Sequence, residues 1–391
     1  MTARRIYLDH AATTPMRPEA VDAMQAYLSD EFANPSGSHR FAREARRVID
    51  EARDAVADCL GCRPGEVIFT GGGTEGDNAA ILGAVRRIDS RGGTARAICS
   101  AAEHHAVLHC VEHVHGTVVG TGSLGSIDTD QLAHAVEDAV AAGAVPVVSV
   151  MAVNNEVGTV TPMTDVATVV RRHGGNASSA VLHSDAVQAA CWVDLAPITA
   201  VVDVLTLSSH KFGGPKGAGI MFQRSGVELE PLIFGGGQER DRRSGTHNVA
   251  GIAATAAALV ATVAERESEC ARVAGLRAEL FAGLIAIGGV RPTVPESASV
   301  PGILHVCIEG VENEALLYLL DEADVCASAA SACASGAMEP SHVLAAMGVP
   351  IDLARGALRL SLGHTTTRDD VRSAIDVIGS AVTRLRSHAR H

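Results

Sequence analysis

Aromatic side chains, positive charge and long apolar runs are all scarce in this sequence of 391 residues. Aromatic residues make up 3% of the chain, which leaves few rings on which the bases of a single strand could stack. Lys plus Arg number 32 against 45 Asp plus Glu, so the formal net charge is −13. An acidic chain repels phosphate backbones. We therefore expect no direct nucleic-acid partner.

The uncharged stretches are too short to indicate a membrane protein. The two longest, 139–153 and 249–264, fall short of the roughly 18–20 strongly apolar residues that cross a bilayer. Asp9 and His10 interrupt the N-terminus before an apolar signal segment could form. The nine cysteines are odd in number and lack the spacing of a disulfide framework, which indicates free thiols in a reducing compartment. The sequence therefore predicts a cytoplasmic protein without a membrane partner.

Strand and helix patterns alternate over about the first 260 residues and predict an α/β fold. Short β-branched runs end in polar or glycine-rich turns, and helical patterns lie between most of them. This alternation is typical of a mainly parallel sheet covered by helices on both faces. The expected strands are 66–70, 96–100, 145–151, 180–183, 202–207 and 219–222.

A long alanine-rich helical pattern, 248–287, leads into a second region with its own strands and helices. We expect a large domain over residues 15–262 and a smaller α+β domain formed by residues 1–14 together with 263–391. In a parallel sheet, ligands collect at the carboxyl ends of the strands. The residues that directly follow each expected strand are therefore the candidates for a functional site.

One such strand runs into glycines and then into a helix, at 67–78 (VIFTGGGTEGDN). Glycines let the backbone approach a ligand closely, and a helix N-terminus offers unpaired N–H groups and a positive dipole end, which together predict a phosphate site. Gly71, Gly73 and Gly76 also satisfy the G-x-G-x-x-G pattern of dinucleotide sites. That pattern requires an acidic residue at the end of the next strand, where Cys99 and Ser100 stand. The dinucleotide interpretation is therefore the weaker one.

Two further strand ends carry reactive side chains. Lys211 ends an apolar strand and precedes a glycine turn, and a lysine in such a crevice becomes nucleophilic as it loses its proton more easily. Asp185 ends another strand, where it serves either as a helix cap or as the partner of a protonated pyridine nitrogen. A phosphate site, an aspartate and a lysine are the three requirements of pyridoxal phosphate: an anchor, a protonated ring and an amine for its aldehyde.

The chain as a whole resembles the cysteine desulfurases, a family of fold type I, class V aminotransferase-like enzymes that use pyridoxal phosphate. The similarity extends over nearly the whole length and rests on ordered blocks. Besides the glycine stretch, the blocks are 7–15 (YLDHAATTP), 34–36 (NPS), 103–108 (EHHAVL), 153–158 (VNNEVG), 208–217 (SSHKFGGPKG), 235–239 (GGGQE), 243–246 (RSGT), 331–333 (SAC), 339–344 (EPSHVL) and 358–363 (LRLSLG).

This resemblance implies how the cofactor is bound. Lys211 would bind its aldehyde as a Schiff base, Asp185 would pair with the pyridinium nitrogen, and His104 would stack on the ring and assist proton transfer. The residues implied to contact the ring hydroxyl region are Asn155 and Gln188, and those implied to hold the phosphate are Thr74, Ser208 and His210. Gly76 stands where a serine is more usual in the family.

The resemblance also implies a substrate clamp and a dimer. Arg359 would bind the carboxylate of the substrate, L-cysteine, with help from Asn34 and Asn155. Thr246 would reach the phosphate bound by a neighbouring subunit, so the active site requires a homodimer.

Cys333 distinguishes a sulfur-transfer enzyme from an aminotransferase. It lies among tiny residues at 327–337 (ASAASACASGA), a composition typical of a surface loop rather than of a packed turn, the alternative for a free cysteine. The resemblance implies that Cys333 takes sulfur from L-cysteine as a persulfide, leaves L-alanine, and passes the sulfur to a protein acceptor or scaffold. Iron–sulfur cluster assembly, tRNA thiolation and DNA sulfur modification are all open destinations. A selenocysteine lyase or an ordinary class V aminotransferase is the alternative function.

A histidine pattern gives a competing, non-enzymatic interpretation. His105, His109 and His113 are four residues apart on one face of an expected helix, a spacing that can bind metal. Acidic ligands are not evident nearby, and an exposed polar helix face explains the pattern equally well. We therefore expect no metal site.

Overall fold

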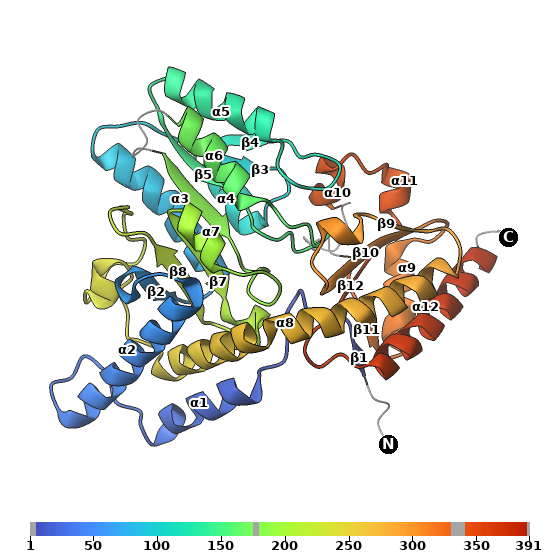
Figure 1. Ribbon diagram of the computed structural model, residues 1–391, viewed down its shortest axis with the longest axis horizontal. Coiled ribbons are helices and arrows are strands. Elements are labelled where there is room, and N and C mark those ends of the chain that lie inside the picture. Colours follow the sequence, from blue (N-terminus) through green and yellow to red (C-terminus); the bar gives the residue numbers. More distant parts are fainter. Residues whose placement is uncertain (1–4, 175–179, 330–340, 389–391) are drawn as a thin grey trace.

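The computed structural model describes residues 5–174, 180–329 and 341–388. Two groups of elements flank the long helix α8 (Val249–Ile285), which runs from one group into the other (Figure 1). Each group has its own main hydrophobic core. Helix α8 continues unbroken past residue 262, so the helix itself does not mark a domain boundary there. The expected division into residues 15–262 and residues 1–14 with 263–391 stays a prediction.

The larger group contains a seven-stranded sheet with the strand order β2-β8-β7-β6-β5-β3-β4. All neighbouring strands are parallel except those of β8, which is antiparallel to both β2 and β7. The mainly parallel α/β sheet expected from the sequence is therefore confirmed. Its strands are β2 (Val67–Thr70), β3 (Ala95–Ser100), β4 (Thr117–Val119), β5 (Val145–Ser149), β6 (Val181–Asp185), β7 (Val204–Ser208) and β8 (Gly219–Gln223).

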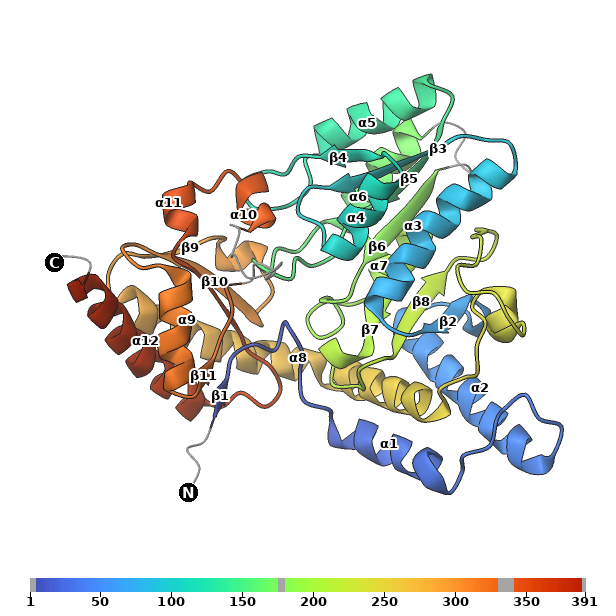
Figure 2. The same ribbon diagram turned by 180° about the vertical axis from the view of Figure 1, so that it is seen from behind.

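Helices cover both faces of this sheet. One face packs against α3 (Gly73–Ser90) and α4 (His105–His113), which lie in front of the strands in Figure 2. Most of the other helices contribute to the core on the opposite face. The remaining helices of this group are α1 (Pro18–Ser29), α2 (Arg40–Leu60), α5 (Thr129–Ala141), α6 (Met163–His173) and α7 (Ala196–Val201).

The smaller group is built on a three-stranded antiparallel sheet with the order β12-β10-β9. The N-terminal strand β1 pairs in parallel with β11, so the start of the chain lies beside residues 325–326. The strands are β1 (Ile6–Tyr7), β9 (Val290–Pro292), β10 (Ile303–Ile308), β11 (Val325–Cys326) and β12 (Ala357–Ser361), and the helices are α9 (Asn313–Glu322), α10 (His342–Ala346), α11 (Ile351–Ala354) and α12 (Arg368–His388). Short 3₁₀ turns in the chain are η1 (Pro64–Glu66), η2 (Ser209–Lys211), η3 (Gln238–Asp241) and η4 (Glu296–Ala298).

Helix α8 is the one helix among the described residues that is long and apolar enough to cross a membrane by length and composition alone. Its most apolar 18-residue segment has a mean hydropathy of 1.4, but 56% of that segment is buried inside the fold. Its first half packs on α1 and α2, and its second half contributes Val273, Leu276, Leu280 and Leu284 to the smaller core. These contacts are those of a core helix.

Candidate active site

A cavity of ≈ 250 Å³ lies at the carboxyl ends of the parallel strands. Its walls come from the turns after β2, β3, β5, β6 and β7, from the N-terminal segment, and from β12 of the smaller sheet. The strand-end rule therefore locates the cavity correctly. The structure brings most of the predicted site residues together here: Thr74, His104, Asn155, Asp185, Gln188, Ser208, His210, Lys211 and Arg359.

Lys211 lies in the 3₁₀ turn that follows β7. Its Nζ donates hydrogen bonds to the backbone oxygens of Ala11 (2.6 Å) and Ala12 (2.9 Å). Burial, assisted by the nearby Arg359, lowers the pKa of Lys211 to about 8, although Asp185 opposes the shift. A lysine with this pKa is partly unprotonated near neutral pH, and its free amine can act as a nucleophile or a base.

Asp185 is the last residue of β6 and is buried. One carboxylate oxygen, Oδ1, accepts a hydrogen bond from the N–H of Val187 at 2.9 Å. Burial raises the pKa of Asp185 to about 6, and the Val187 hydrogen bond and Lys211 both work against that increase. A buried carboxylate of this kind favours a cationic group beside it, such as a protonated ring nitrogen.

Two buried carboxyl groups near Asp185 were not predicted from the sequence. Asp77 also lines the cavity, and Glu103 lies behind it, where its Oε1 accepts a hydrogen bond from the N–H of Met151 at 2.7 Å. Burial raises the pKa of both groups well above the ordinary value, and the charge of Asp185 raises them further. Burial therefore favours the neutral form of both carboxyl groups over the charged form. Both residues lie in sequence blocks that carry the family resemblance, but no local sequence pattern indicates that their side chains are buried.

His104 begins helix α4 as its N-cap, and its Nδ1 accepts a hydrogen bond from the N–H of Ala106 at 3.1 Å. Burial lowers the pKa of His104 to about 4, and Lys211 acts in the same direction. The His104 ring at the cavity wall is therefore an uncharged imidazole near neutral pH, and it can stack on another ring.

The glycine stretch forms a cradle at one end of the cavity. Gly73 begins α3, whose first N–H groups have no partner within the helix. A Cβ atom at Gly73 would lie 2.8 Å from Val187 Cγ2, so only glycine leaves this wall open. Thr74, Ser208 and His210 line the cavity beside it. Hydroxyl, imidazole and backbone donors around a helix N-terminus are the groups that bind a phosphate.

Arg359 extends from β12 into the cavity and is 5% exposed. Its Nη1 donates to the backbone oxygen of Asn155, and its Nη2 forms an ion pair with Asp9 Oδ1, both at 2.8 Å. The Nε atom is buried without a partner among the described residues, so the guanidinium retains a donor for a further acceptor. Asp9 is a site residue that sequence reasoning missed, although it stands in a quoted block.

Three predicted residues are not part of this cavity as described. Asn34 is exposed in the turn between α1 and α2, where its Oδ1 accepts a hydrogen bond from the N–H of Ser36 at 2.9 Å. Thr246 is exposed in the segment before α8 and lies outside the cavity of its own chain. Cys333 lies outside the described residues. The roles of all three stay predictions.

His105 and His109 of α4 are close together, with 5.1 Å between their ring centroids, and the ring of His342 of α10 lies 4.6 Å from that of His105. Burial lowers the pKa of His105, and the other two rings contribute to the decrease. No group of three or more His, Cys, Asp or Glu side chains in the described part of the chain has an arrangement that could hold a metal ion.

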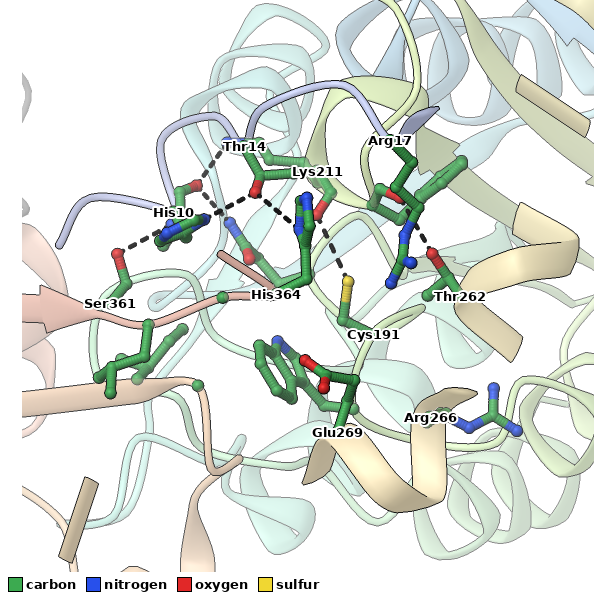
Figure 3. A pocket seen from close by; sticks show the side chains of 18 residues that line it. His10, Thr14, Arg17, Cys191, Lys211, Thr262, Arg266, Glu269, Ser361 and His364 are labelled. Carbon is green, nitrogen blue, oxygen red and sulfur yellow. Dashed lines mark hydrogen bonds between the residues drawn. The ribbon is translucent and has the colours of Figure 1, made fainter. Parts of the chain in front are cut away.

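A second, smaller cavity of ≈ 40 Å³ shares Ala11, Gln188 and Lys211 with the first among its lining residues. Figure 3 shows this second cavity, with Lys211 and Cys191 among its labelled residues. Cys191 faces it, and its thiol lies 3.5 Å from the backbone oxygen of Lys211. Burial raises the pKa of Cys191 to about 12, so this sulfur is a thiol and not a nucleophilic thiolate. Among the residues that line it, we find neither the glycine cradle nor Asp185. The ≈ 250 Å³ cavity, whose lining includes both Gly73 and Asp185, is therefore the better candidate for the reaction site.

The protein belongs to the aminotransferase class-V family, which it matches over residues 6–373. It is 42% identical to the IscS-like cysteine desulfurase of Mycobacterium tuberculosis, covering 98% of each chain. It is 38% identical to the cysteine desulfurase IscS of Dictyoglomus turgidum, covering 98% of this chain and 96% of the relative.

Two solved structures extend these comparisons. A NifS-like protein has a TM-score of 0.89 at 32% identity, with 97% of this chain and 100% of that chain covered. DndA from Streptomyces lividans has a TM-score of 0.74 at 34% identity, with 91% and 99% covered. Enzymes of this family use pyridoxal phosphate. The observed cavity fits that group, because Lys211, Asp185 and the open wall at Gly73 provide an amine, a buried carboxylate and a phosphate cradle.

Proposed function

We propose that this protein is a cysteine desulfurase, which binds pyridoxal phosphate in the ≈ 250 Å³ cavity and transfers sulfur from L-cysteine to Cys333. The observation that carries the proposal is the convergence of Lys211, Asp185 and the Gly73 cradle in one cavity. Full-length similarity to relatives named as cysteine desulfurases supports the choice of reaction.

The cofactor would be held by residues that already line the cavity. Lys211 would bind it covalently, Asp185 would face its ring nitrogen, and His104 would lie against its ring. The residues that would hold its phosphate are Thr74, Ser208 and His210, and those that would contact its ring hydroxyl are Asn155 and Gln188. When bound, pyridoxal phosphate supplies an electron sink for bonds at the α-carbon of an amino acid.

The substrate's carboxylate would be bound by the cationic guanidinium of Arg359 through charge-assisted hydrogen bonds. Its Nε has no partner among the described residues, and its Nη1 and Nη2 donate to Asn155 and Asp9. Lys211, with its pKa of about 8, would accept the α-proton at Nζ and return it, because its free amine and its ammonium form are both accessible near neutral pH. The neutral ring of His104 would assist these proton movements.

Sulfur transfer would then use Cys333. Its thiolate attacks the sulfur of the bound L-cysteine, so a sulfur–sulfur bond forms while the bond from Cβ to sulfur breaks. The electron pair of the broken bond remains with the organic fragment, which takes up protons and leaves as L-alanine. The balance is one L-cysteine and one enzyme thiol giving one L-alanine and one enzyme persulfide. A protein sulfur acceptor or scaffold would then discharge the persulfide.

Two measurements test this proposal. Borohydride reduction followed by peptide mapping should find the reduced cofactor adduct on Lys211, and its absence there would reject the cofactor assignment. In single-turnover reactions without added thiol, Cys333→Ser should retain the visible absorption of the cofactor but lose formation of L-alanine and sulfide. Cys326→Ser is the matched control, because it removes a thiol from the same part of the chain and should leave turnover unchanged. A keto acid product would indicate an aminotransferase instead.

We also propose that the active enzyme is a homodimer in which Thr246 reaches the phosphate of the neighbouring subunit. Thr246 is exposed outside its own cavity, and nearby Phe234 is 73% exposed in the single chain. Sedimentation equilibrium should give a mass near twice 40.3 kDa. A monomer that retains full activity would contradict the proposal.

A further inference from the structure

A carboxylate lies on the glycine turn that leads into the phosphate cradle, next to Thr74 but outside the residues that line the ≈ 250 Å³ cavity. Glu75 stands in the first turn of α3, directly after Thr74, and its Oε2 accepts a hydrogen bond from the N–H of Gly71 at 2.9 Å. A Cβ atom at Gly71 would lie only 2.6 Å from this oxygen, so the carboxylate is packed against the turn. A phosphate group carries about −1.5 to −2 charges near pH 7 and is repelled by a neighbouring carboxylate. A cation that offsets the charge of Glu75 would therefore favour phosphate binding in the neighbouring cradle.

Arg243 provides that cation. Its Nε lies 2.9 Å from Glu75 Oε1, and its Nη2 lies 3.2 Å from Oε2, so the guanidinium engages both oxygens. The two side chains are 28% and 23% exposed in the single chain. The hydrogen bond and charge of Glu75 raise the pKa of Arg243. Among the ion pairs of residues 5–174, 180–329 and 341–388, this is the one that Glu75 forms.

The loop that carries Arg243 is held in a strained conformation. Glu239, Arg240 and Asp241 have φ angles of 49°, 58° and 64°, in the left-handed region that non-glycine residues rarely adopt. Such strain persists only where the surroundings fix it, and it concentrates at functional sites. Here a run of three left-handed residues directly precedes the segment that presents Arg243.

A buried carboxylate fixes this strained turn to the phosphate seat. Glu239 is 5% exposed and accepts hydrogen bonds from Arg53 Nη1 (2.8 Å), Arg53 Nη2 (2.7 Å) and the N–H of Phe69 (3.2 Å). Phe69 belongs to β2, the strand that leads into the glycine turn. The loop and the glycine turn are therefore joined twice, through Glu239 to β2 and through Arg243 to Glu75.

We infer that Arg243 is a positioning residue for the cofactor phosphate, which acts by neutralising Glu75 at the glycine turn. This inference rests on the proposed function, because it takes the phosphate of pyridoxal phosphate as the ligand of that turn. Glu75 holds the N–H of Gly71, and Arg243 cancels the charge that Glu75 brings to the seat. A role as a direct phosphate ligand is the competing explanation, and a double variant distinguishes the two.

The experiment compares the dissociation constants of pyridoxal phosphate and of pyridoxal, which lacks the phosphate, for the apo forms of the full-length protein. Arg243→Gln should weaken pyridoxal phosphate binding by about tenfold or more and change pyridoxal binding by less than about twofold. Adding Glu75→Gln should restore pyridoxal phosphate binding to within about threefold of the wild type, because the uncompensated charge is then gone. Arg240→Gln is the control, since this residue lies in the same loop and its side chain donates a hydrogen bond to the backbone oxygen of Gly65 and not to Glu75.

Each possible result either supports or overturns the inference about Arg243. Equal weakening of both ligands by Arg243→Gln, or a double variant that stays as weak as the single one, overturns the inference and leaves the proposed function standing. Unchanged pyridoxal phosphate binding by Arg243→Gln also overturns it. A wild-type protein that binds no pyridoxal phosphate overturns the proposed function itself, a different outcome from the other three.

Discussion

The same substitution, glycine to alanine, should have opposite effects at two helical glycines of this protein. Gly275 lies within α8, and a Cβ atom there would meet nothing within 4 Å. Alanine is about 0.8–1 kcal/mol more favourable than glycine in a helix interior. Gly275→Ala should therefore stabilise the fold by up to about 1 kcal/mol.

Gly76 lies within α3, where a Cβ atom would be 2.5 Å from Thr206 Cγ2 and 3.0 Å from its Oγ1. Gly76 and Thr206 are both buried, and Thr206 Oγ1 lies 3.0 Å from Nε2 of the buried His183. The Thr206 side chain therefore cannot move away from a new Cβ atom without disturbing its contact with His183. Overpacking of a core costs about 1–3 kcal/mol. After the gain in helix propensity, Gly76→Ala should destabilise the fold by about 1–2 kcal/mol. The same contact also leaves no room for the Cβ atom of a serine at position 76 of this chain.

The assay compares the urea midpoints of the cofactor-loaded wild type and variants, measured together. Midpoints are compared directly because a chain with two hydrophobic cores need not unfold in a single two-state transition. Thr206→Ser removes Cγ2 and keeps the hydroxyl, so the double variant Gly76→Ala with Thr206→Ser should be more stable than additivity predicts by about 1 kcal/mol or more. The reasoning is refuted if Gly76→Ala is as stable as the wild type, or if the two changes are additive.

Three further predictions concern titration and binding. The rate at which the apo protein bonds covalently to pyridoxal phosphate should be half-maximal near pH 8, since burial lowers the pKa of Lys211 to about 8; a midpoint near 10.5 would contradict this. Arg359→Lys should raise the KM for L-cysteine by about tenfold or more without changing the cofactor absorption, because an ammonium cannot reproduce the forked donors; an unchanged KM would reject the clamp. Burial alone would raise the pKa of Glu239, but His247, Arg53 and the N–H of Phe69 outweigh it and lower the pKa to about 2. Because this value is below that of an unfolded glutamate, about 4.3, the stabilisation is present above that pH and is lost as the pH falls toward 2. Denaturation midpoints between pH 5 and 2 should therefore fall more steeply for the wild type than for Glu239→Gln, and parallel curves would be evidence against the assignment.

The sequence predicts features that depend on local pattern. β-Branched runs followed by polar turns reveal where a buried strand stops. Asp185 accordingly ends β6, while Lys211 lies three residues beyond the end of β7, in the 3₁₀ turn rather than in the strand itself. The glycine cradle is predictable for the same reason, since strand, glycines and helix follow one another directly. The three-residue strand β4 is missed because it is too short to show any periodicity.

Features that depend on contacts distant in sequence could not be predicted from these patterns. The ion pair between Asp9 and Arg359 joins residues 350 positions apart, and no local pattern links them. The burial of Asp77 and Glu103 depends on how α3 and α4 pack against the sheet. The antiparallel direction of β8 is decided by the path of the chain after Lys211, because a short turn returns it beside β7.

The N-terminal segment connects the two halves of the site. Asp9 forms the ion pair with Arg359 of the smaller sheet, while the backbone oxygens of Ala11 and Ala12 accept hydrogen bonds from Lys211 of the larger one. Only one residue separates Asp9 from Ala11, so these two interactions are mechanically linked. The short stretch from Asp9 to Ala12 therefore contacts Arg359 through a side chain and Lys211 through its backbone, and it joins the part of the cavity proposed to bind the substrate carboxylate to the part proposed to bind the cofactor.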